Sequence, residues 1–320
     1  MESVLVVALA YATCSDLTPH STLHTIEYMS PYLWMCLSTF LMALMGTMTH
    51  HLGHNAGCPW QITAFVRMFG MLLVMIPILR ASRVKFPWRA SANLWGRTLA
   101  GTCAVMCTFF SLSYLPVSDA TTLYHTAPIW IVLFSWIAYG RIPDKKICVA
   151  VLCCMAGILI VHQPHFLTTN STKIIAVIAA AGTAMFMAVA FMNLNAMKHV
   201  PSLAIVVHFS LWGSVILFFL CFFTHCLTPD AMPKHFYPDV FLLTGVGLAG
   251  AAGQIALTKA YKNGKTANVA VVGLSQVIFA AVFEMILWGR AYTVFEAFGF
   301  AMILVPIAMI ILKEYSETEA

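Results

Sequence analysis

Ten apolar stretches lie between residues 31 and 312 of this chain, and each is close to the roughly 20 residues that cross the hydrocarbon of a bilayer as a helix. They are continuously apolar and do not alternate with polar residues, which indicates helices and not the strands of a membrane barrel. Only 9% of the residues are charged and 61% are apolar, too little polar surface for a soluble domain of 320 residues. The sequence therefore predicts an all-α membrane protein with ten transmembrane helices, at residues 31–50, 61–79, 95–113, 119–138, 144–161, 173–193, 201–223, 238–258, 266–287 and 293–312.

The basic residues are divided unevenly between the two ends of these predicted helices. If the helices alternate in direction, 13 of the 17 Lys and Arg fall on one side, three fall on the other, and Arg67 lies within a helix. Translocated loops avoid Lys and Arg, so the bias predicts a multi-pass protein of the cell (inner) membrane with both termini in the cytoplasm. The 13 residues are Arg80, Arg83, Lys85, Arg89, Arg97, Arg141, Lys145, Lys146, Lys198, Lys259, Lys262, Lys265 and Lys313.

This charge pattern also bears on the partners of the chain. The net charge of +5 is explained by topology, so no nucleic-acid partner is expected. We expect a lipid bilayer and a small-molecule substrate as partners, and the sequence leaves a homodimer open.

The second half of the chain repeats the pattern of the first. Residues 113–116 and 119–121, before the fourth predicted helix, are similar to residues 260–263 and 266–268, before the ninth, and both helices end in similar triplets at 139–141 and 288–290. Each half holds five helices, an odd number, so the second half enters the membrane inverted. We predict an N-terminal extension at 1–30, five-helix repeats at 31–162 and 173–312, and a cytoplasmic tail at 313–320. Inverted repeats are a recurrent transporter design, in which a central site is exposed alternately to each side.

Four motifs carry a resemblance to a known family. They are Ala64 to Gly70, Ser111 to Pro116, Asp119-Ala120-Thr121 leading to Ala127-Pro128-Ile129, and Lys259-Ala260-Tyr261. In this order and spacing the chain resembles the EamA-like ten-helix branch of the drug/metabolite transporter superfamily over residues 31–312. The resemblance implies that each predicted repeat is an EamA-like repeat and that the chain transports amino acids or other metabolites. Some relatives in intracellular bacteria look like S-adenosylmethionine carriers.

The chain departs from the pattern of that family at two equivalent places. The family commonly has a glutamate after the glycine that closes the fourth and ninth helices, where this chain has Arg141 and Arg290. Any role that the resemblance implies for that acid therefore does not carry over to this sequence.

Arg67 stands out because a charge within a membrane helix costs roughly 2.5–3.5 kcal/mol unless it faces a cavity or a partner. We expect it to face the interior, either to contact a carboxylate or phosphate of the substrate or as a structural charge. His208 takes the corresponding place when residues 66–68 are laid over residues 207–209. The two side chains are expected to approach the midplane from opposite halves, although a lone His in a helix is more often a structural hydrogen-bonding group.

Further polar residues lie within the fourth, eighth and ninth predicted helices. Pro128 removes a hydrogen-bond donor, so a kink is expected close to the polar residues that precede it. In the ninth helix, small and polar residues share one stripe from Gly273 to Glu284. The predicted substrate-binding residues are Arg67, Thr121, Tyr124, His125, His208, Gln254 and Gln276, and Glu284 is predicted as a coupling carboxylate or counter-charge.

No catalytic residue, metal site or cofactor is predicted. The ten cysteines show no paired CxxC spacing, and His50, His51 and His54 stand in a predicted solvated loop without a nearby acid or cysteine. An intramembrane enzyme would need convergent catalytic groups, and a channel would need a continuous polar stripe. The sequence instead predicts a secondary active transporter of a small polar metabolite, an amino acid or a related zwitterion or organic anion. An S-adenosylmethionine-type uptake or exchange carrier is the alternative.

Overall fold

A computed structural model of the chain describes residues 30–56, 59–82, 84–87, 91–115, 117–140, 144–163, 171–226 and 236–318. All regular secondary structure in these ranges is helical, which confirms the all-α prediction. The helices are α3 (Pro31–Ala56), α4 (Trp60–Ala81), α5 (Ala92–Tyr114), α6 (Val117–Tyr124), α7 (Ala127–Tyr139), α8 (Lys145–His162), α9 (Ser171–Ala196), α10 (Ser202–Phe223), α11 (Phe236–Asn263), α12 (Thr266–Gly273), α13 (Ser275–Trp288) and α14 (Val294–Thr318).

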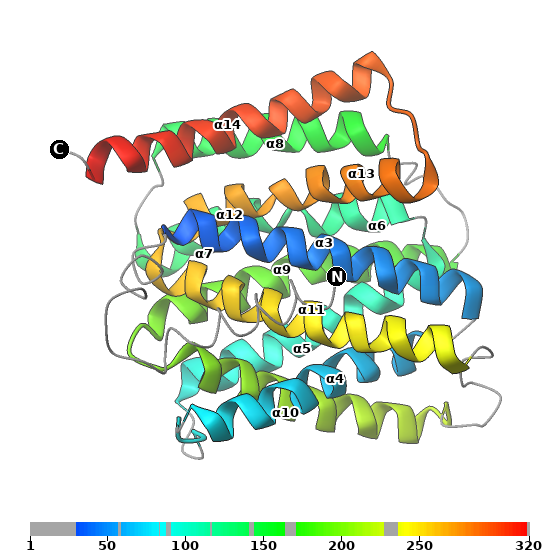
Figure 1. Cartoon of the computed structure of the whole chain (residues 1–320). Helices are drawn as coiled ribbons and strands as arrows, with labels where there is room; N and C mark the ends of the chain where they lie inside the picture. The colour runs from blue at the N-terminus through cyan, green and yellow to red at the C-terminus, as the bar shows by residue number, and fades with distance from the viewer. Residues whose placement is uncertain are drawn as a thin grey trace.

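The helices run side by side in one bundle (Figure 1). α8 and α14 pack on each other at one edge of the bundle, and α4 and α10 pack on each other at the opposite edge. The remaining helices fill the space between these two pairs.

The packing of the first half is repeated by the second half. α3 packs mainly on α11, and α9 packs mainly on α5. In the same way α13 packs on α3 while α7 packs on α9. The first helix of each half therefore lies against the other half, and the largest apolar cluster draws on residues of both halves, such as Trp34 and Phe191. The two halves are interlocked and share one interior.

The fourth and ninth predicted helices are each broken in two. α6 ends at Tyr124 and α7 begins at Ala127, and Pro128 near the start of α7 has no amide hydrogen to continue the helical ladder. The expected kink near Pro128 is confirmed as a complete break. α12 ends at Gly273 and α13 begins at Ser275, although no proline lies there. The single stripe expected from Gly273 to Glu284 is therefore interrupted.

The two broken helices also end alike. The chain leaves α7 through Gly140, at φ 62°, and leaves α13 through Gly289, at φ 63°. Left-handed backbone of this kind favours glycine, which closes a helix without a Cβ penalty. This explains the two similar glycine-containing triplets seen in the sequence.

Several predicted boundaries shift. α3 continues to Ala56, so His50, His51 and His54 belong to a helix and the prediction of a loop there is wrong. α14 continues to Thr318, so most of the predicted tail at 313–320 is helical. Residues 1–29, which make up nearly all of the predicted extension, lie outside the described residues, as do Arg83, Arg89 and Arg141.

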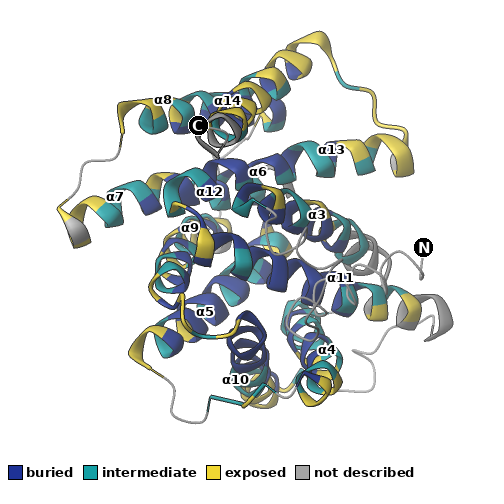
Figure 2. Ribbon diagram, turned by 60° about the vertical axis from the view of Figure 1, so that its left-hand side comes forward, coloured by how far each residue is buried: buried dark blue, intermediate teal, exposed yellow. Residues whose placement is uncertain are grey.

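The outer surface of the bundle is apolar. Figure 2 shows exposed residues on the outward faces of the helices and buried residues toward the middle. Ile137, Phe223 and Met309 are 69%, 73% and 66% exposed, as side chains that contact lipid would be. Seven stretches are long and apolar enough to cross a membrane: Pro31–Thr49, Trp60–Ala81, Lys145–His162, Lys173–Ala196, Ser202–Phe223, Thr266–Leu287 and Val294–Lys313. The number of ten transmembrane helices therefore stays a prediction.

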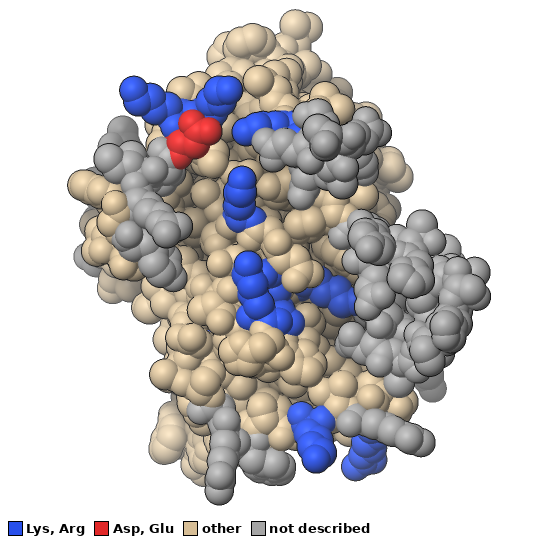
Figure 3. Space-filling model, turned by 90° about the vertical axis from the view of Figure 1, so that its left-hand side faces the viewer, with Lys and Arg blue, Asp and Glu red and all other residues tan. Residues whose placement is uncertain are grey.

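Basic side chains gather at the end of the bundle where α14 ends (Figure 3). Exposed lysines include Lys145 and Lys146 at the start of α8, and Lys198 and Lys265 between helices. This is the end that the charge bias assigns to the cytoplasm.

Candidate functional site

A cavity of about 60 Å³ lies between the halves, at the point where both broken helices are interrupted. His125 and Ala127 line it from the break between α6 and α7, and Gly273 and Leu274 line it from the break between α12 and α13. Side chains of α3, α9 and α11 close its remaining walls. Helix ends leave backbone groups without helical partners, so a polar ligand can bind where two such breaks meet.

Three predicted site residues line this cavity: Tyr124, His125 and Gln276. They come from both halves of the chain, and the structure brings them together around one cavity. The sequence could not show this proximity. Thr121 lies one turn before His125, and its carbonyl accepts the His125 amide at 3.0 Å. Thr121 does not itself line the cavity.

Two hydroxyl groups of α3 hold the cavity wall together. Thr39 shares a hydrogen bond of 2.8 Å with Ser275 at the start of α13. Ser38 donates to the Gly253 carbonyl of α11 at 2.9 Å. These buried bonds satisfy the polar groups of α3 within the apolar interior.

Aromatic rings form another wall of the cavity. Phe191 of α9 and Tyr261 of α11 stack with their ring centroids 4.3 Å apart and an angle of 18° between their planes. Tyr124 contributes a third ring to the lining. The cavity thus offers both polar contacts and flat apolar surfaces.

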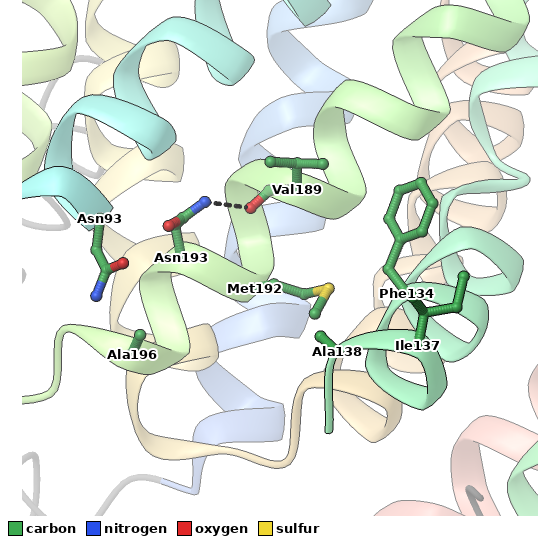
Figure 4. A pocket seen from close by; sticks show the side chains of 8 residues that line it. All are labelled: Asn93, Phe134, Ile137, Ala138, Val189, Met192, Asn193 and Ala196. Carbon is green, nitrogen blue, oxygen red and sulfur yellow. Dashed lines mark hydrogen bonds between the residues drawn. The ribbon is translucent and has the colours of Figure 1, made fainter. Parts of the chain in front are cut away.

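A larger groove of about 380 Å³ opens between α5, α7 and α9 (Figure 4). Its lining is mostly apolar, and the Asn193 amide in it donates to the Val189 carbonyl of its own helix at 2.9 Å. The central cavity is smaller, but polar groups of several helices converge on it. We therefore place the candidate site in the central cavity.

Arg97 is a buried cation that the sequence reasoning missed. The charge bias places it at the cytoplasmic end, yet the residue is only 2% exposed. Its Nη2 donates to Gln254 Oε1 at 3.0 Å, and its guanidinium lies 4.3 Å from the centroid of the Phe209 ring. The one available signal was Gly101, one turn farther along α5, whose missing side chain leaves room for the guanidinium.

Arg67 lies beside this group on α4. Its guanidinium is 5.8 Å from the centroid of the Phe109 ring and lies in the neighbourhood of Tyr124 of the central cavity. Arg67 and Arg97 are also within electrostatic range of each other. Among the described residues, the ion pairs are those of Arg290, so neither Arg67 nor Arg97 is paired with a carboxylate.

His208 makes a hydrogen bond and a ring contact with α5. Its Nδ1 shares a hydrogen bond of 2.8 Å with Thr98, and its ring stands edge-on to Trp95 at 4.9 Å. Within the described residues it makes no hydrogen bond to Arg67. The buried partner that approaches Arg67 is Arg97, from the same half of the chain.

Three titratable side chains lie in a row from the cavity toward the end of α13: His125, His162 and Glu284. The rings of His125 and His162 are nearly parallel with centroids 6.5 Å apart, and Thr122 bonds His162 Nδ1 at 3.1 Å. His162 in turn interacts electrostatically with Glu284. Two histidines therefore lie between the cavity and Glu284, the predicted coupling carboxylate.

Glu284 itself lies in a polar cluster at the end of α13. It pairs with Arg290 at 2.7 Å and accepts a hydrogen bond from the Tyr292 hydroxyl at 3.0 Å. Partial burial and the neighbouring Glu284 carboxylate raise the pKa of Tyr292, so that phenol remains a donor. Arg290 also reaches Glu296, which caps the start of α14 with Thr293. Arg290, one departure from the family pattern, thus joins two helices.

The opposite end of the cavity is closed by bonds between α9, α11 and α12. Asn195 Nδ2 donates to the carbonyls of Tyr261 and Gly264, at 3.0 and 2.9 Å. Asn268 of α12 donates to the Tyr32 hydroxyl of α3 at 2.9 Å. The bond between Asn268 and Tyr32 joins the two halves, whereas the Asn195 bonds lie within the second half.

The described residues offer no cluster of three or more His, Cys, Asp or Glu side chains arranged to hold a metal ion. The polar side chains that line the cavity are hydroxyl, amide and imidazole groups. They suit the binding of a polar organic solute.

Comparison with known proteins identifies the family. Residues 29–163 and 174–312 match the EamA-like transporter family. The chain belongs to this family. As an EamA-like member of the drug/metabolite transporter superfamily, it is a multi-pass membrane protein, and the two matched segments correspond to the two halves that interlock around the cavity.

The relatives of this EamA-like protein include several transporters. It is 22% identical to a pseudopaline exporter of Pseudomonas aeruginosa, over 77% of this chain and 83% of the relative. It is 26% identical to human solute carrier family 35 member G1, over 73% of this chain and 66% of that protein. An uncharacterized transporter of Helicobacter pylori is 21% identical, over 73% of this chain and 78% of the relative.

The fold is also found in a solved crystal structure. That structure matches with a TM-score of 0.74 at 18% identity, covering 88% of this chain and 96% of the other. At this identity the likeness concerns the fold alone.

Proposed function

We propose that this EamA-like protein is a secondary active transporter that carries a small polar metabolite by alternating access between two inverted five-helix repeats. The observation that carries this proposal is the position of the central cavity at both helix breaks, one from each half. Transporters built from repeats bind their substrates near the midplane, at discontinuous helices. The equivalent packing of the two halves supports a movement of one against the other.

In this proposal Tyr124, His125 and Gln276 contact the substrate directly, because they line the cavity. Arg67 and Gln254 belong to the adjoining wall, and Thr121 and His208 support it from α6 and α10. A cavity of about 60 Å³ is smaller than a metabolite, so the breaks must separate to admit one.

The cargo is proposed as an amino acid or a related zwitterion or organic anion. The name of the P. aeruginosa relative, a pseudopaline exporter, supports transport of a metabolite. The aromatic wall formed by Tyr124, Phe191 and Tyr261 favours S-adenosylmethionine as the second candidate, because an adenine ring can stack there.

We further propose that Glu284 couples transport to protons, through His162 and His125. The placement of His125 and His162 between the cavity and Glu284 supports this role. We place both chain ends in the cytoplasm of the cell (inner) membrane, which the basic face in Figure 3 supports. A reporter fused to the C-terminus, active only in the cytoplasm, would test that orientation.

Exchange in proteoliposomes tests the proposed function. Vesicles are loaded with unlabelled S-adenosylmethionine or an amino-acid mixture, and uptake of the labelled solute is followed with and without a pH gradient. Saturable uptake supports the proposal, and the solute that exchanges identifies the cargo. No exchange of any tested solute by folded protein would contradict it.

A variant in the cavity links uptake to this site. A Cβ at Gly273 would lie 2.7 Å from the flexible end of Met35, so Gly273→Leu should fill the cavity and abolish exchange. Gly46→Leu is the matched control, because a Cβ there meets no atom within 4 Å. Unchanged exchange by folded Gly273→Leu protein would place the site elsewhere.

A further inference from the structure

Arg97 extends its charge toward the middle of the membrane instead of toward the nearer surface. It lies five residues after the start of α5, roughly 8 Å from that end of the helix at 1.5 Å per residue. Basic side chains near a helix end usually extend back to the interface. Here the guanidinium lies beside Gly101, one turn deeper, where a Cβ would be only 2.2 Å from Nη1. The fold therefore holds this cation inside the bundle despite the free-energy cost of removing it from water.

Arg67 approaches the same region from the other end. It lies seven residues after the start of α4, roughly 10 Å from the end of the bundle opposite to the start of α5. The two guanidinium groups interact electrostatically, and like charges in a medium of low dielectric repel each other strongly. Among the described residues no carboxylate pairs with either one.

The hydrogen bonding of Arg97 is also incomplete. The described protein atoms offer it one acceptor, the neutral amide oxygen of Gln254. Its buried Nε has no hydrogen-bond partner. A buried donor without an acceptor is costly, and a guanidinium fits a carboxylate or phosphate through two parallel bonds.

We propose that Arg67 and Arg97 together bind an anionic group of the transported solute, a carboxylate or a phosphate. Tyr124 places the central cavity next to this cation pair, since it lines the cavity and lies in the neighbourhood of Arg67. The solute thus places its anionic end between α4, α5 and α11 and the rest of its body in the cavity. This inference rests on the proposed function and adds the charge class of the cargo to it.

Thermal stability of the purified full-length protein in uncharged detergent tests the pair directly. Succinate, glutamate and inorganic phosphate serve as anionic probes, and leucinamide and spermidine serve as cationic ones, all at equal ionic strength. At least one anion should raise the unfolding temperature, because a ligand of the folded state stabilises it. The cationic probes should leave the unfolding temperature unchanged. Stabilisation by cations alone, or by none of the anions, would overturn the inference.

Two variants separate the pair from other anion sites. Arg97→Gln should weaken the apparent affinity for the anion by roughly tenfold or more, through the lost charge-assisted bonds. Gly101→Ala keeps the charge but displaces the guanidinium, and should weaken binding similarly. Gly46→Ala, at an open position of α3, should bind like the natural protein. If one variant fails to fold, the other still decides, and unchanged binding by either folded variant would overturn the inference.

The test also distinguishes a solute from a lipid. Phosphatidylglycerol added to the detergent supplies the same phosphate chemistry from a headgroup. Stabilisation by this lipid alone, lost in Arg97→Gln, would assign the pair to lipid and overturn the inference. Exchange of only neutral or cationic solutes in proteoliposomes would likewise overturn it while the proposed function stands. No exchange of any solute would instead contradict the proposed function.

Discussion

Arg97 of α5 donates from Nη2 to Oε1 of Gln254 of α11, at 3.0 Å. This bond joins a buried cation of the first half to a neutral amide of the second. It connects a residue that the sequence assigns to one surface with one that it assigns to the interior. The bond also suggests how the site can be altered by a single charge.

Gln254→Glu should make the protein more stable and less able to bind anions. The new carboxylate would pair with Arg97 in a charge-assisted bond and occupy the place of the anionic solute. We expect a higher unfolding temperature together with a loss of anion-dependent stabilisation and of exchange. Gln254→Met is the matched control, because it keeps the length of the side chain without the charge. Unchanged exchange by Gln254→Glu would argue that the anion does not bind at Arg97.

Asn195→Ala should destabilise the protein by about 1–2 kcal/mol, because the carbonyls of Tyr261 and Gly264 both lose their donor. The control is Asn193→Ala, since the Asn193 amide donates only within its own helix, to Val189. Denaturation of the two purified variants measures the difference. Equal stabilities would mean that the bonds from α9 to α11 contribute little.

Thr98→Val should lower stability by about 1 kcal/mol, since buried hydrogen bonds between membrane helices contribute amounts of this order. The change leaves His208 without its hydroxyl partner on α5. Thr102→Val removes a hydroxyl that bonds only to the Thr98 carbonyl of the same helix, and should cost less. Unfolding temperatures of both variants check the order, and the reverse order would show that the bond to His208 is not the stabilising one.

Glu284→Gln should leave exchange intact but remove its dependence on the pH gradient. The neutral amide can still accept from Arg290 and Tyr292 but cannot bind a proton in this pH range. Glu296→Gln is the comparison, because Glu296 contacts the same arginine without lying near His162 in the contacts described. Solute uptake in proteoliposomes with and without the gradient measures both. Retained gradient dependence in Glu284→Gln would exclude Glu284 as the coupling group.

Hydrophobic pattern alone was enough to predict a helical membrane protein of two similar halves. Lipid requires every backbone group to be bonded within the protein, so long apolar stretches have one structural solution. The break near Pro128 was also readable, because a proline lacks the amide hydrogen that a helix needs. Tyr124, His125 and Gln276 were identified as polar groups within apolar helices, and all three line the central cavity.

Which polar groups contact one another depends on the packing of the helices and could not be predicted from the sequence. The break at Leu274 could not be predicted from the sequence, because no proline lies there. It depends on how α12 and α13 pack against the other half. Arg97 resembled a surface residue because it lies near a helix end, and its direction was set by the space beside Gly101 and by the Phe209 ring of another helix. Likewise, the ion pair of Glu284 with Arg290 and the hydrogen bond of His208 with Thr98 were not predicted from the sequence. Such pairings depend on contacts between segments distant in sequence, which hydrophobic pattern and residue type do not specify.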